Sequence, residues 1–502
     1  MIRFPTLTSV FSARLAPLAL ALLLAGCAVG PDYQRPAIDV GAGFKEGEGT
    51  VPGWKRAQPA DQVERGEWWR VYGDATLDAL MADLNTANQT VAQSEANYRQ
   101  AQALVNSARS AFFPTVGADA GLTRAGNGAS SQSTGTSTSN QYSLSGSVSW
   151  ELDVWGRIRR QVESSQASAA ASGADLAATR LSAQSALAQN YLQLRILDEQ
   201  KRLLDATVAA YERSLQLTRN RYEAGVAGKA DVAVAETQLE NTRAQSIDLD
   251  WQRGQYEHAI AVLVGLAPSR FALPPAPFTQ QLPEIPVALP ATLLERRPDV
   301  AAAERRAAAA NADIGVAVAA WFPDLTLSAS GGFRSGQFGD LLTAPARFWS
   351  LGPALALTIF DGGAREAQIA SARAAYDSQA AAYRQSVLVA LREVEDYLIQ
   401  LRVMAQEQEV QRRALTSARE SLRLTRNQYE AGLVDYLSVA VVEATALNAE
   451  RSALTLLGNR LNASVQLIAA LGGGWEGLPQ ADRPPAAQET ATAGTPAPAA
   501  QP

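Results

Sequence analysis

Two side chains with versatile chemistry occur once each, the thiol of Cys27 and the imidazole of His258. A zinc site built from several Cys and His residues is therefore excluded, and so is a disulfide within the chain. His258 lies inside a long helical pattern, and no nucleophile motif accompanies it. We interpret His258 as a helix-surface residue and predict no metal site, no cofactor and no enzyme activity, although carboxylate chemistry stays open as an alternative.

Cys27 ends an N-terminal segment with the layout of a secretory signal peptide. A basic start precedes an apolar stretch at 15–24 that is too short to span a bilayer. The Leu-Ala-Gly-Cys motif that ends at Cys27 resembles a lipobox, which implies cleavage before Cys27 and lipidation of its thiol. An ordinary signal peptide that contains a cysteine is the alternative. We predict a lipoprotein signal peptide at 1–26 and lipidation at Cys27.

The next residue and the overall charge indicate the compartment and the partners. In many Gram-negative bacteria an aspartate directly after the lipidated cysteine retains lipoproteins in the inner membrane, so Ala28 implies the outer membrane. Two or three acyl chains would bind outer-membrane lipid firmly, because each buried CH2 group contributes about 0.8 kcal/mol. The formal net charge of -6 leaves no basic surplus, and we predict no nucleic-acid partner.

A unit of about two hundred residues is present twice in the chain. Residues 214–225 and 421–432 differ at two of twelve positions, with an offset of 207. Upstream, 111–114 and 320–323 match at nearly the same offset. A constant offset over this span indicates an internal duplication. We place the first structural repeat at 81–270, a linker at 271–297 and the second structural repeat at 298–475.

Each copy contains two segments with the alternating pattern of β-strands. In 142–153 apolar or aromatic residues alternate with serine and acidic residues, and 115–124 carries a weaker version. The second copy repeats the patterns at 324–333 and 349–359, where Pro353 marks a flaw or an edge. Each segment is near the length of a tilted membrane strand, about 9–11 residues. A soluble sandwich is the alternative, but it needs more strands than two hairpins supply.

Two long stretches without proline, 157–267 and 354–478, are rich in helix-forming residues. Their apolar residues recur with the spacing of a coiled coil. A helix over 161–222 would be roughly 90 Å long, which no compact domain holds. Gly225 and Gly432 follow the long helices where a helix stop is expected. Each copy is therefore predicted to contain a long helical hairpin with a glycine turn at its tip.

Four membrane strands cannot close a barrel alone, since the smallest closed membrane barrels have about eight. An open sheet edge cannot face lipid, so strands from several chains must be pooled. A dimer, a trimer and a larger ring all satisfy this requirement. The serine-rich strand faces would then line a wet lumen, and the helices would continue the wall of the tube.

Three motifs outside the most similar repeat segments are informative together. They are the start at 27–36, the block at 68–74 that contains Trp68-Trp69, and the stretch 293–300, which reads Leu-Leu-Glu-Arg-Arg-Pro-Asp-Val. These motifs resemble the TolC-like outer-membrane factors, and specifically the branch of NodT-type efflux lipoproteins. The similarity covers about 27–475.

The resemblance implies a mixed, mainly α fold in which a homotrimer forms an outer-membrane β-barrel from four strands per chain. A long periplasmic α-helical barrel continues it, and 27–80 forms an N-terminal equatorial segment. The implied function is that of the channel in a tripartite efflux system, a passive exit duct for drugs or other small molecules. An inner-membrane pump, of the resistance-nodulation-division type, supplies the energy, and a periplasmic adaptor joins pump and channel at the helical tips.

The resemblance also implies a gate at the periplasmic tips, held by hydrogen bonds, ion pairs and often an acidic ring. This sequence departs from that pattern, because Ser438 and Val441 stand where relatives often carry gate aspartates. The candidate gate or tip residues are Asp231, Asp435, Tyr436, Tyr429 and Arg426. Ordinary solvated tip residues are the alternative interpretation.

Two other functions stay open from the sequence. A periplasmic coiled-coil spacer without a pore would explain the helices and Cys27, but not two hairpins with alternating faces. Export of proteins or peptides would keep the channel and change the cargo. The tail at 476–502 is rich in Pro, Ala and Thr and is predicted to be disordered.

Overall fold

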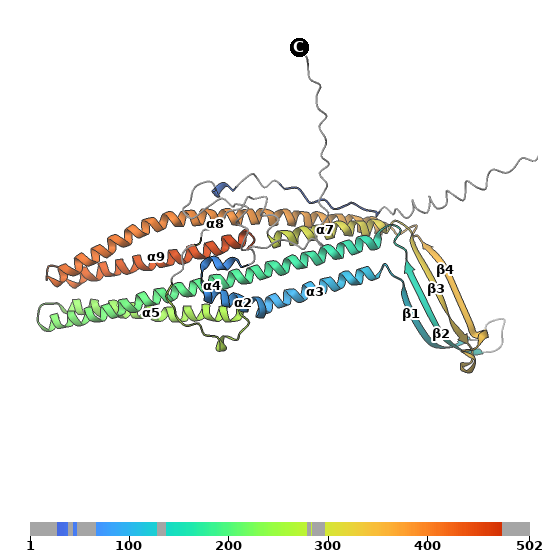
Figure 1. Ribbon diagram of the computed structural model, residues 1–502, viewed down its shortest axis with the longest axis horizontal. Helices are drawn as coiled ribbons and strands as arrows, with labels where there is room; N and C mark the ends of the chain where they lie inside the picture. Colours follow the sequence, from blue (N-terminus) through green and yellow to red (C-terminus); the bar gives the residue numbers. More distant parts are fainter. Residues whose placement is uncertain are drawn as a thin grey trace, which may run out of the picture.

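The computed structural model describes residues 28–38, 44–47, 67–127, 137–278, 283 and 297–473. The predicted signal peptide, Cys27, most of the predicted linker and the predicted tail lie outside these residues. The described chain is elongated and mainly helical, with one four-stranded sheet at one end and two helical tips at the other (Figure 1). The predicted mixed, mainly α fold is confirmed.

The major helices form pairs of equal length, one from each copy. The long helices α4 (Arg157–Glu223) and α8 (Ala364–Glu430) have 67 residues each, which is roughly 100 Å of helix. The shorter pairs are α5 (Lys229–Leu263) with α9 (Tyr436–Ala470), and α3 (Gln89–Ser110) with α7 (Pro298–Ala319). These equal lengths confirm the internal duplication.

The sheet is antiparallel, with its strands in sequence order. The strands are β1 (Thr115–Asn127), β2 (Ser137–Glu151), β3 (Asp324–Ser335) and β4 (Arg347–Ala356). β1 and β2 extend further at the hairpin end than predicted, because Gly126 and Asn127 still have ladder partners. β4 ends earlier than predicted. Its last residue already pairs with the first residue of β3, so the pattern at 357–359 has no strand to pair with.

Pro353 lies in β4, where it pairs with Leu327 of β3. Since β4 ends the order of strands in the described sheet, a residue without a backbone N–H is tolerated there. β1 ends the sheet on the opposite side. Both edges therefore present unpaired backbone groups within the described chain.

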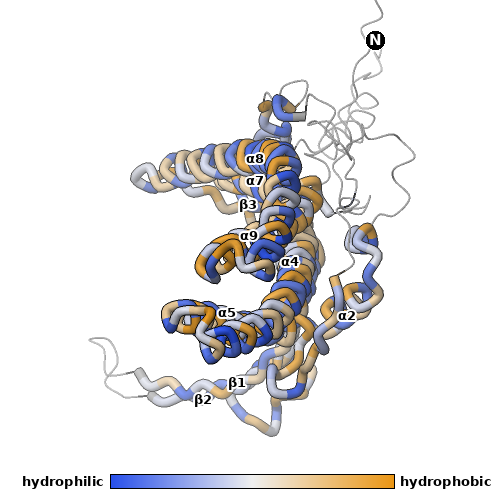
Figure 2. Tube along the Cα trace, turned by 90° about the vertical axis from the view of Figure 1, so that its left-hand side faces the viewer, coloured by the Kyte–Doolittle hydropathy of each residue, from blue (hydrophilic) through white to orange (hydrophobic). Residues whose placement is uncertain are grey.

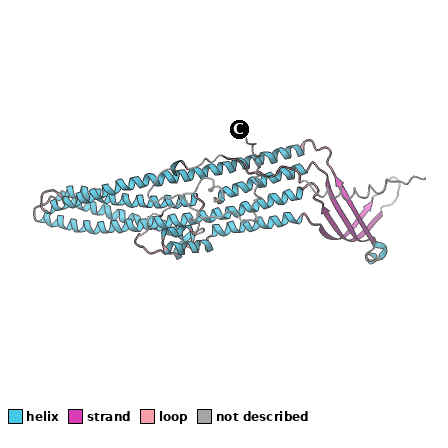
Figure 3. Ribbon diagram, turned by 45° about the horizontal axis from the view of Figure 1, so that its top comes forward, coloured by secondary structure: helices cyan, strands magenta, loops and turns pink. Residues whose placement is uncertain are grey.

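The helices form two hairpins, α4 with α5 and α8 with α9, which lie side by side along their length (Figure 3). An end-on view shows the two hairpins stacked next to each other (Figure 2). α7 packs on both α4 and α8, and α3 packs on α4. No described helix combines the length and the apolarity needed to cross a bilayer.

The short elements lie at three places. α2 (Ala75–Ala87) and the 3-10 helix η3 (Trp68–Tyr72) pack beside the middle of α4, and η4 (Pro268–Arg270) contacts α5. The 3-10 helix η1 (Lys45–Gly47) packs on α8, whereas η5 (Phe338–Asp340) and η6 (Ala344–Ala346) lie between β3 and β4. Trp68, Tyr72 and Leu77 join Leu187 and Tyr191 of α4 in the largest apolar cluster. This cluster fixes the N-terminal elements to the long helix.

Candidate functional site

One face of the sheet is apolar across all four strands. The register places apolar or small residues of neighbouring strands opposite one another, for example Leu144 of β2 between Ala120 of β1 and Phe333 of β3. The same face carries Val116 and Leu122 of β1, Tyr142 and Val148 of β2, Leu325 and Leu327 of β3, and Trp349, Leu351 and Leu355 of β4. Most of these large side chains are exposed. A continuous exposed apolar face of this kind suits contact with lipid.

The opposite face carries mainly Ser, Thr and Gly. Ser147 lies between Gly117 and Ser330, and the hydroxyls of Ser330 and Ser350 lie 2.8 Å apart. At the hairpin end, the Arg334 guanidinium lies 4.8 Å from the centre of the Phe348 ring. A face of small polar side chains suits contact with water and leaves room for a lumen.

Aromatic residues form a collar where the sheet joins the helices. Trp155 stacks on Phe322, with ring centres 4.8 Å apart, and its indole N–H donates to the Pro323 carbonyl over 2.9 Å. Trp321 carries the Arg365 guanidinium 4.6 Å from its ring centre. Tryptophan and tyrosine are enriched at the two interfaces of a membrane. A collar of this kind suits the level at which a membrane-embedded sheet would leave the bilayer.

The first described residues of the chain lie at this collar. The backbone N–H of Val29 donates to the Trp155 carbonyl over 3.1 Å. A Cβ added to Gly156 would lie only 2.8 Å from the Cα of Ala28, so the two backbones are in close contact. Cys27 is outside the described residues, but it is bonded to Ala28. The predicted lipidation site is thus next in the chain to a residue at the collar.

From the collar the N-terminal segment follows α4 and α7. Asp32 accepts from Arg160 of α4 over 2.8 Å, and the Tyr33 hydroxyl donates to Glu304 of α7 over 2.9 Å. Burial, reinforced by Glu304, raises the pKa of Tyr33 far above its usual range. Gly30 has a positive φ and lies so close to Gly315 that an added Cβ would be 2.5 Å from its Cα. These contacts fix the N-terminal segment to both copies of the repeat.

The tips close with the same turn in both copies. Gly225 and Gly432 both have φ of 75°, in the left-handed region that favours glycine. In each copy, the backbone N–H of the residue after the glycine donates a hydrogen bond to the third-last carbonyl of the preceding helix. Val226 donates to Arg221 over 2.8 Å, and Leu433 donates to Gln428 over 2.9 Å. This hydrogen-bond pattern is a Schellman motif. It reverses the chain within a few residues.

The two candidate gate aspartates cap the helices that follow these turns. Asp435 accepts from the backbone N–H of Ser438 over 3.0 Å and from its hydroxyl over 2.7 Å. These hydrogen bonds hold the pKa of Asp435 below its usual range. Asp231 accepts from the backbone N–H of Gly228 over 3.0 Å. Both carboxylates therefore have a local capping role, whatever they contribute to a gate.

The candidate aromatic residues meet in a joint between the two hairpins. Tyr429 and Tyr436 lie edge to face, with ring centres 5.7 Å apart. Arg221 lies 4.5 Å from the centre of the Tyr429 ring and donates to the Tyr429 carbonyl over 3.1 Å. The Thr218 hydroxyl lies 3.3 Å from the Tyr429 hydroxyl. Arg221 and Thr218 were not among the predicted site residues.

Arg426, the remaining candidate, pairs with Glu443 of α9 over 2.7 Å. Arg426 is half exposed, whereas the Glu443 side chain is buried and one of its oxygens has no hydrogen bond. Burial, with a smaller contribution from the charge of this carboxylate, raises the pKa of Tyr211 and of Tyr436. Burial raises the pKa of Glu443, although Arg426 opposes the shift. The sequence could have identified Glu443, because this glutamate occupies a position in the coiled-coil pattern of α9 at which the other residues are mostly apolar.

The free energy of local unfolding of the tip is expected to fall as the pH rises through the raised pKa of Glu443. A carboxyl with a raised folded pKa binds its proton more readily in the folded state, so its contribution is complete below the ordinary glutamate pKa and is lost above the folded one. Glu443→Gln should abolish this dependence. The measurement is hydrogen exchange of tip peptides between about pH 4 and pH 8.

The matched control is Glu236→Gln, because Glu236 occupies the same place in the first copy and is half exposed. Its variant should keep the wild-type pH dependence. Equal pH dependence in wild type and Glu443→Gln would contradict the role assigned to this carboxylate.

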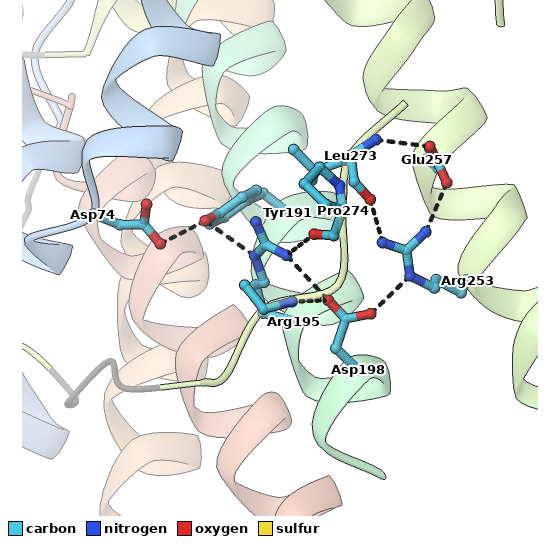
Figure 4. Close-up of polar contacts among 9 residues, drawn as sticks. Asp74, Tyr191, Arg195, Asp198, Arg253, Glu257, Leu273 and Pro274 are labelled. Carbon is cyan, nitrogen blue, oxygen red and sulfur yellow. Dashed lines mark hydrogen bonds and ion pairs between the residues drawn. The ribbon is translucent and has the colours of Figure 1, made fainter. Parts of the chain in front are cut away.

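A buried polar network holds the middle of the first hairpin (Figure 4). Asp198 of α4 accepts from Arg195 over 3.0 Å and from Arg253 of α5 over 2.7 Å. Arg195 also donates to the hydroxyl of Tyr191, which in turn donates to Asp74 over 2.5 Å. Burial and the Asp74 contact raise the pKa of Tyr191 to about 12.

The same network fixes the chain that follows α5. Arg195 donates to the Pro274 carbonyl over 2.9 Å, and Arg253 donates to the Leu273 carbonyl. Glu257 accepts from Arg253 over 2.7 Å and from the Leu273 N–H over 2.8 Å. Together these contacts link α2, α4, α5 and the segment that follows α5, beside the middle of α4 (Figure 4).

The sequence and the fold both have close counterparts among known proteins. The family model described as "Outer membrane efflux protein" matches residues 80–266 and 289–473. The chain is similar to the toluene efflux pump outer membrane protein TtgF of Pseudomonas putida, with 30% identity over 465 residues, which are 92% of this chain and 97% of that protein.

A second relative is the pyoverdine export outer membrane protein OpmQ of Pseudomonas aeruginosa, 31% identical over 424 residues, with 83% of this chain and 89% of that protein covered. Among solved structures, that of the outer-membrane channel OprN superposes with a TM-score of 0.82 at 31% identity. It covers 89% of this chain and 100% of that one.

Proposed function

The chain belongs to the outer membrane efflux protein family, and from this premise we propose that it works as a lipid-anchored homotrimer. It is the outer-membrane channel component of a tripartite efflux system, the exit duct for small molecules that an inner-membrane pump energises. The family consists of channel proteins, and we infer that this chain carries out no catalysis.

The two-faced sheet is the observation that carries the proposal of a trimer. Its four strands have one apolar face, one face of small polar residues and two open edges. Open edges cannot remain in lipid, so further strands must pair with β1 and β4. Three copies would supply twelve strands, enough to close a barrel around a wet lumen.

The helical tips are the proposed docking site for a periplasmic adaptor, which would connect the channel to a pump of the resistance-nodulation-division type. Val226 and Leu433 occupy equivalent places directly after the tip glycines, and both are largely exposed. Apolar side chains at the far end of a long helical tube suit contact with another protein. We also propose that Asp231, Asp435, Tyr436, Tyr429 and Arg426 contribute to the closed state of this end.

Lipidation of Cys27 would place acyl chains at the collar. Ala28 contacts Gly156 there, beside the aromatic residues that mark the membrane interface. An anchor at this level inserts into the periplasmic leaflet of the outer membrane without deforming the chain. The N-terminal segment then links the anchor to α4 and α7 through Asp32 and Tyr33.

Cys27→Ser is expected to abolish labelling of the protein with a radioactive fatty acid. Since Cys27 precedes every described strand and helix of the chain, assembly of the channel should persist. The measurement combines acyl labelling with the native mass of the detergent-extracted protein. Labelling that survives the substitution would overturn the assignment of Cys27.

The function is tested by deleting the gene and measuring accumulation of a fluorescent efflux substrate in intact cells. Deletion should raise accumulation, and the cloned chain should lower it again only while the inner-membrane pump is present. Unchanged accumulation of a panel of dyes, antibiotics and solvents, together with loss of a protein from the medium, would favour protein export instead.

A further inference from the structure

The buried network around Asp198 has an incomplete counterpart in the second copy. Asp198 of α4 lies between Arg195 and Arg253, and it accepts from Nε of Arg253 over 2.7 Å (Figure 4). The second hairpin repeats the first at an offset of 207, so Arg460 of α9 is the counterpart of Arg253. The counterpart of Asp198 is Ala405 of α8. The second copy therefore keeps the arginine and lacks the carboxylate.

The second copy also lacks the other carboxylate that this arginine uses. In the first copy, Arg253 donates to Glu257 over 2.7 Å. The counterpart of Glu257 is Ser464, whose hydroxyl lies 2.7 Å from the Tyr72 hydroxyl. A neutral side chain with this partner supplies no negative charge to Arg460.

Arg402, the counterpart of Arg195, has a carboxylate of its own, because it pairs with Glu46 of η1. Arg460 has none within the described part of the chain. Its Nη1 donates to the side-chain oxygen of Gln408 on α8, and its Nε is buried without a hydrogen-bond partner. Burial lowers the pKa of Arg460, but a guanidinium stays protonated in proteins. The second copy thus holds a half-buried positive charge without a counter-charge.

We propose that the second copy binds a small inorganic anion of the chloride type at Arg460, in the place that the Asp198 carboxylate has in the first copy. The anion accepts from Nε of Arg460 and lies beside Ala405, so that it joins α9 to α8. A half-buried charge needs an opposite charge, which a water molecule does not supply. Relative to aspartate, Ala405 lacks one carboxyl group, and a halide ion is closer to that group in size than a phosphate is.

Bound in this place, the anion is a structural ligand of the second helical hairpin. A ligand that binds only the folded state raises the free energy of unfolding as its concentration increases. The stability of the contact between α8 and α9 therefore depends on chloride, whereas α4 and α5 are joined by the carboxylate of Asp198. The site lies within one chain, so it is independent of the number of protomers in the channel and of the exported molecule.

The site is tested by thermal unfolding of the detergent-extracted protein, with chloride replacing gluconate at constant ionic strength. The unfolding midpoint of the wild type should rise with chloride and then level off. Ala405→Asp supplies the carboxylate of the first copy, so its midpoint in gluconate should be higher than that of the wild type and should not respond to chloride. The matched control Ala414→Asp adds the same charge at an exposed position of α8 and should respond as the wild type does. A chloride response that survives in Ala405→Asp, or that is absent from the wild type, would overturn the site.

The position of the ion is tested with bromide, which is located in a crystal by its anomalous X-ray scattering. Crystals of the wild-type protein grown in bromide should show an anomalous peak within hydrogen-bond distance of Nε of Arg460. The peak should be absent from Ala405→Asp and from Arg460→Gln. An empty site in the wild type, or a carboxylate of another segment or protomer bonded to Arg460, would overturn the anion. The native mass of the same variants reports separately on the proposed trimer.

Discussion

Leu144→Arg is expected to prevent assembly of the channel in the outer membrane. Leu144 lies near the middle of β2 on the apolar face, between Ala120 and Phe333. An arginine on the lipid face of a membrane barrel costs about 2–4 kcal/mol at the midplane, and a trimer carries the substitution three times. The summed cost is of the same order as the net stability of a typical fold, about 5–15 kcal/mol.

Ser147→Arg is the matched control for this prediction. Ser147 lies on the same strand and faces the opposite side, between Gly117 and Ser330. An arginine there would enter the wet lumen, and trimers should form in normal amounts. The measurement is the yield of native-mass protein in isolated outer membranes. Normal assembly of Leu144→Arg, or equal loss in both variants, would contradict the assignment of the two faces.

Asp198→Ala is expected to lower the free energy of unfolding by about 3–5 kcal/mol, the usual effect of removing one partner from a buried ion pair. The Asp198 side chain is only 4% exposed and is the shared acceptor of Arg195 and Arg253. Its loss leaves two largely buried guanidinium groups with fewer acceptors. The chain after α5 should loosen as well, since the same arginines hold Leu273 and Pro274.

Glu409→Ala serves as the control, because the pair of Glu409 with Arg412 on α8 is exposed. Such surface pairs contribute about 0–1 kcal/mol. Denaturant unfolding of the detergent-extracted protein, followed by far-UV circular dichroism, measures both variants. A difference between them of less than 1 kcal/mol, taken as roughly the size of an ordinary surface effect, would contradict a structural role for the buried network.

The repeated elements could be predicted from the sequence because each has its own periodicity. The strict alternation of apolar and polar residues from 142 onward identified β2. The absence of proline over 157–267 and 354–478 identified the long helical hairpins. The glycine stops at Gly225 and Gly432 gave the position of both tips. Strand ends were less accurate, because the end of β4 is decided by where β3 begins and not by its own alternating pattern.

Contacts between distant segments could not be predicted in the same way. Asp74, Tyr191 and Arg253 are far apart in the sequence and share no motif, and only the fold brings them into one network. Asp435 was assigned to a gate, whereas its position three residues before Ser438 also fits a helix cap. Glu443 was overlooked, since burial of its side chain depends on the packing of α9 against α4.

The native mass of the protein, extracted from outer membranes in mild detergent, tests the central claim most directly. The account predicts a single species of three mature chains, because the four strands of one copy cannot form a closed wall. A stable monomer in the membrane extract would contradict it, since an open sheet with two free edges forms no pore.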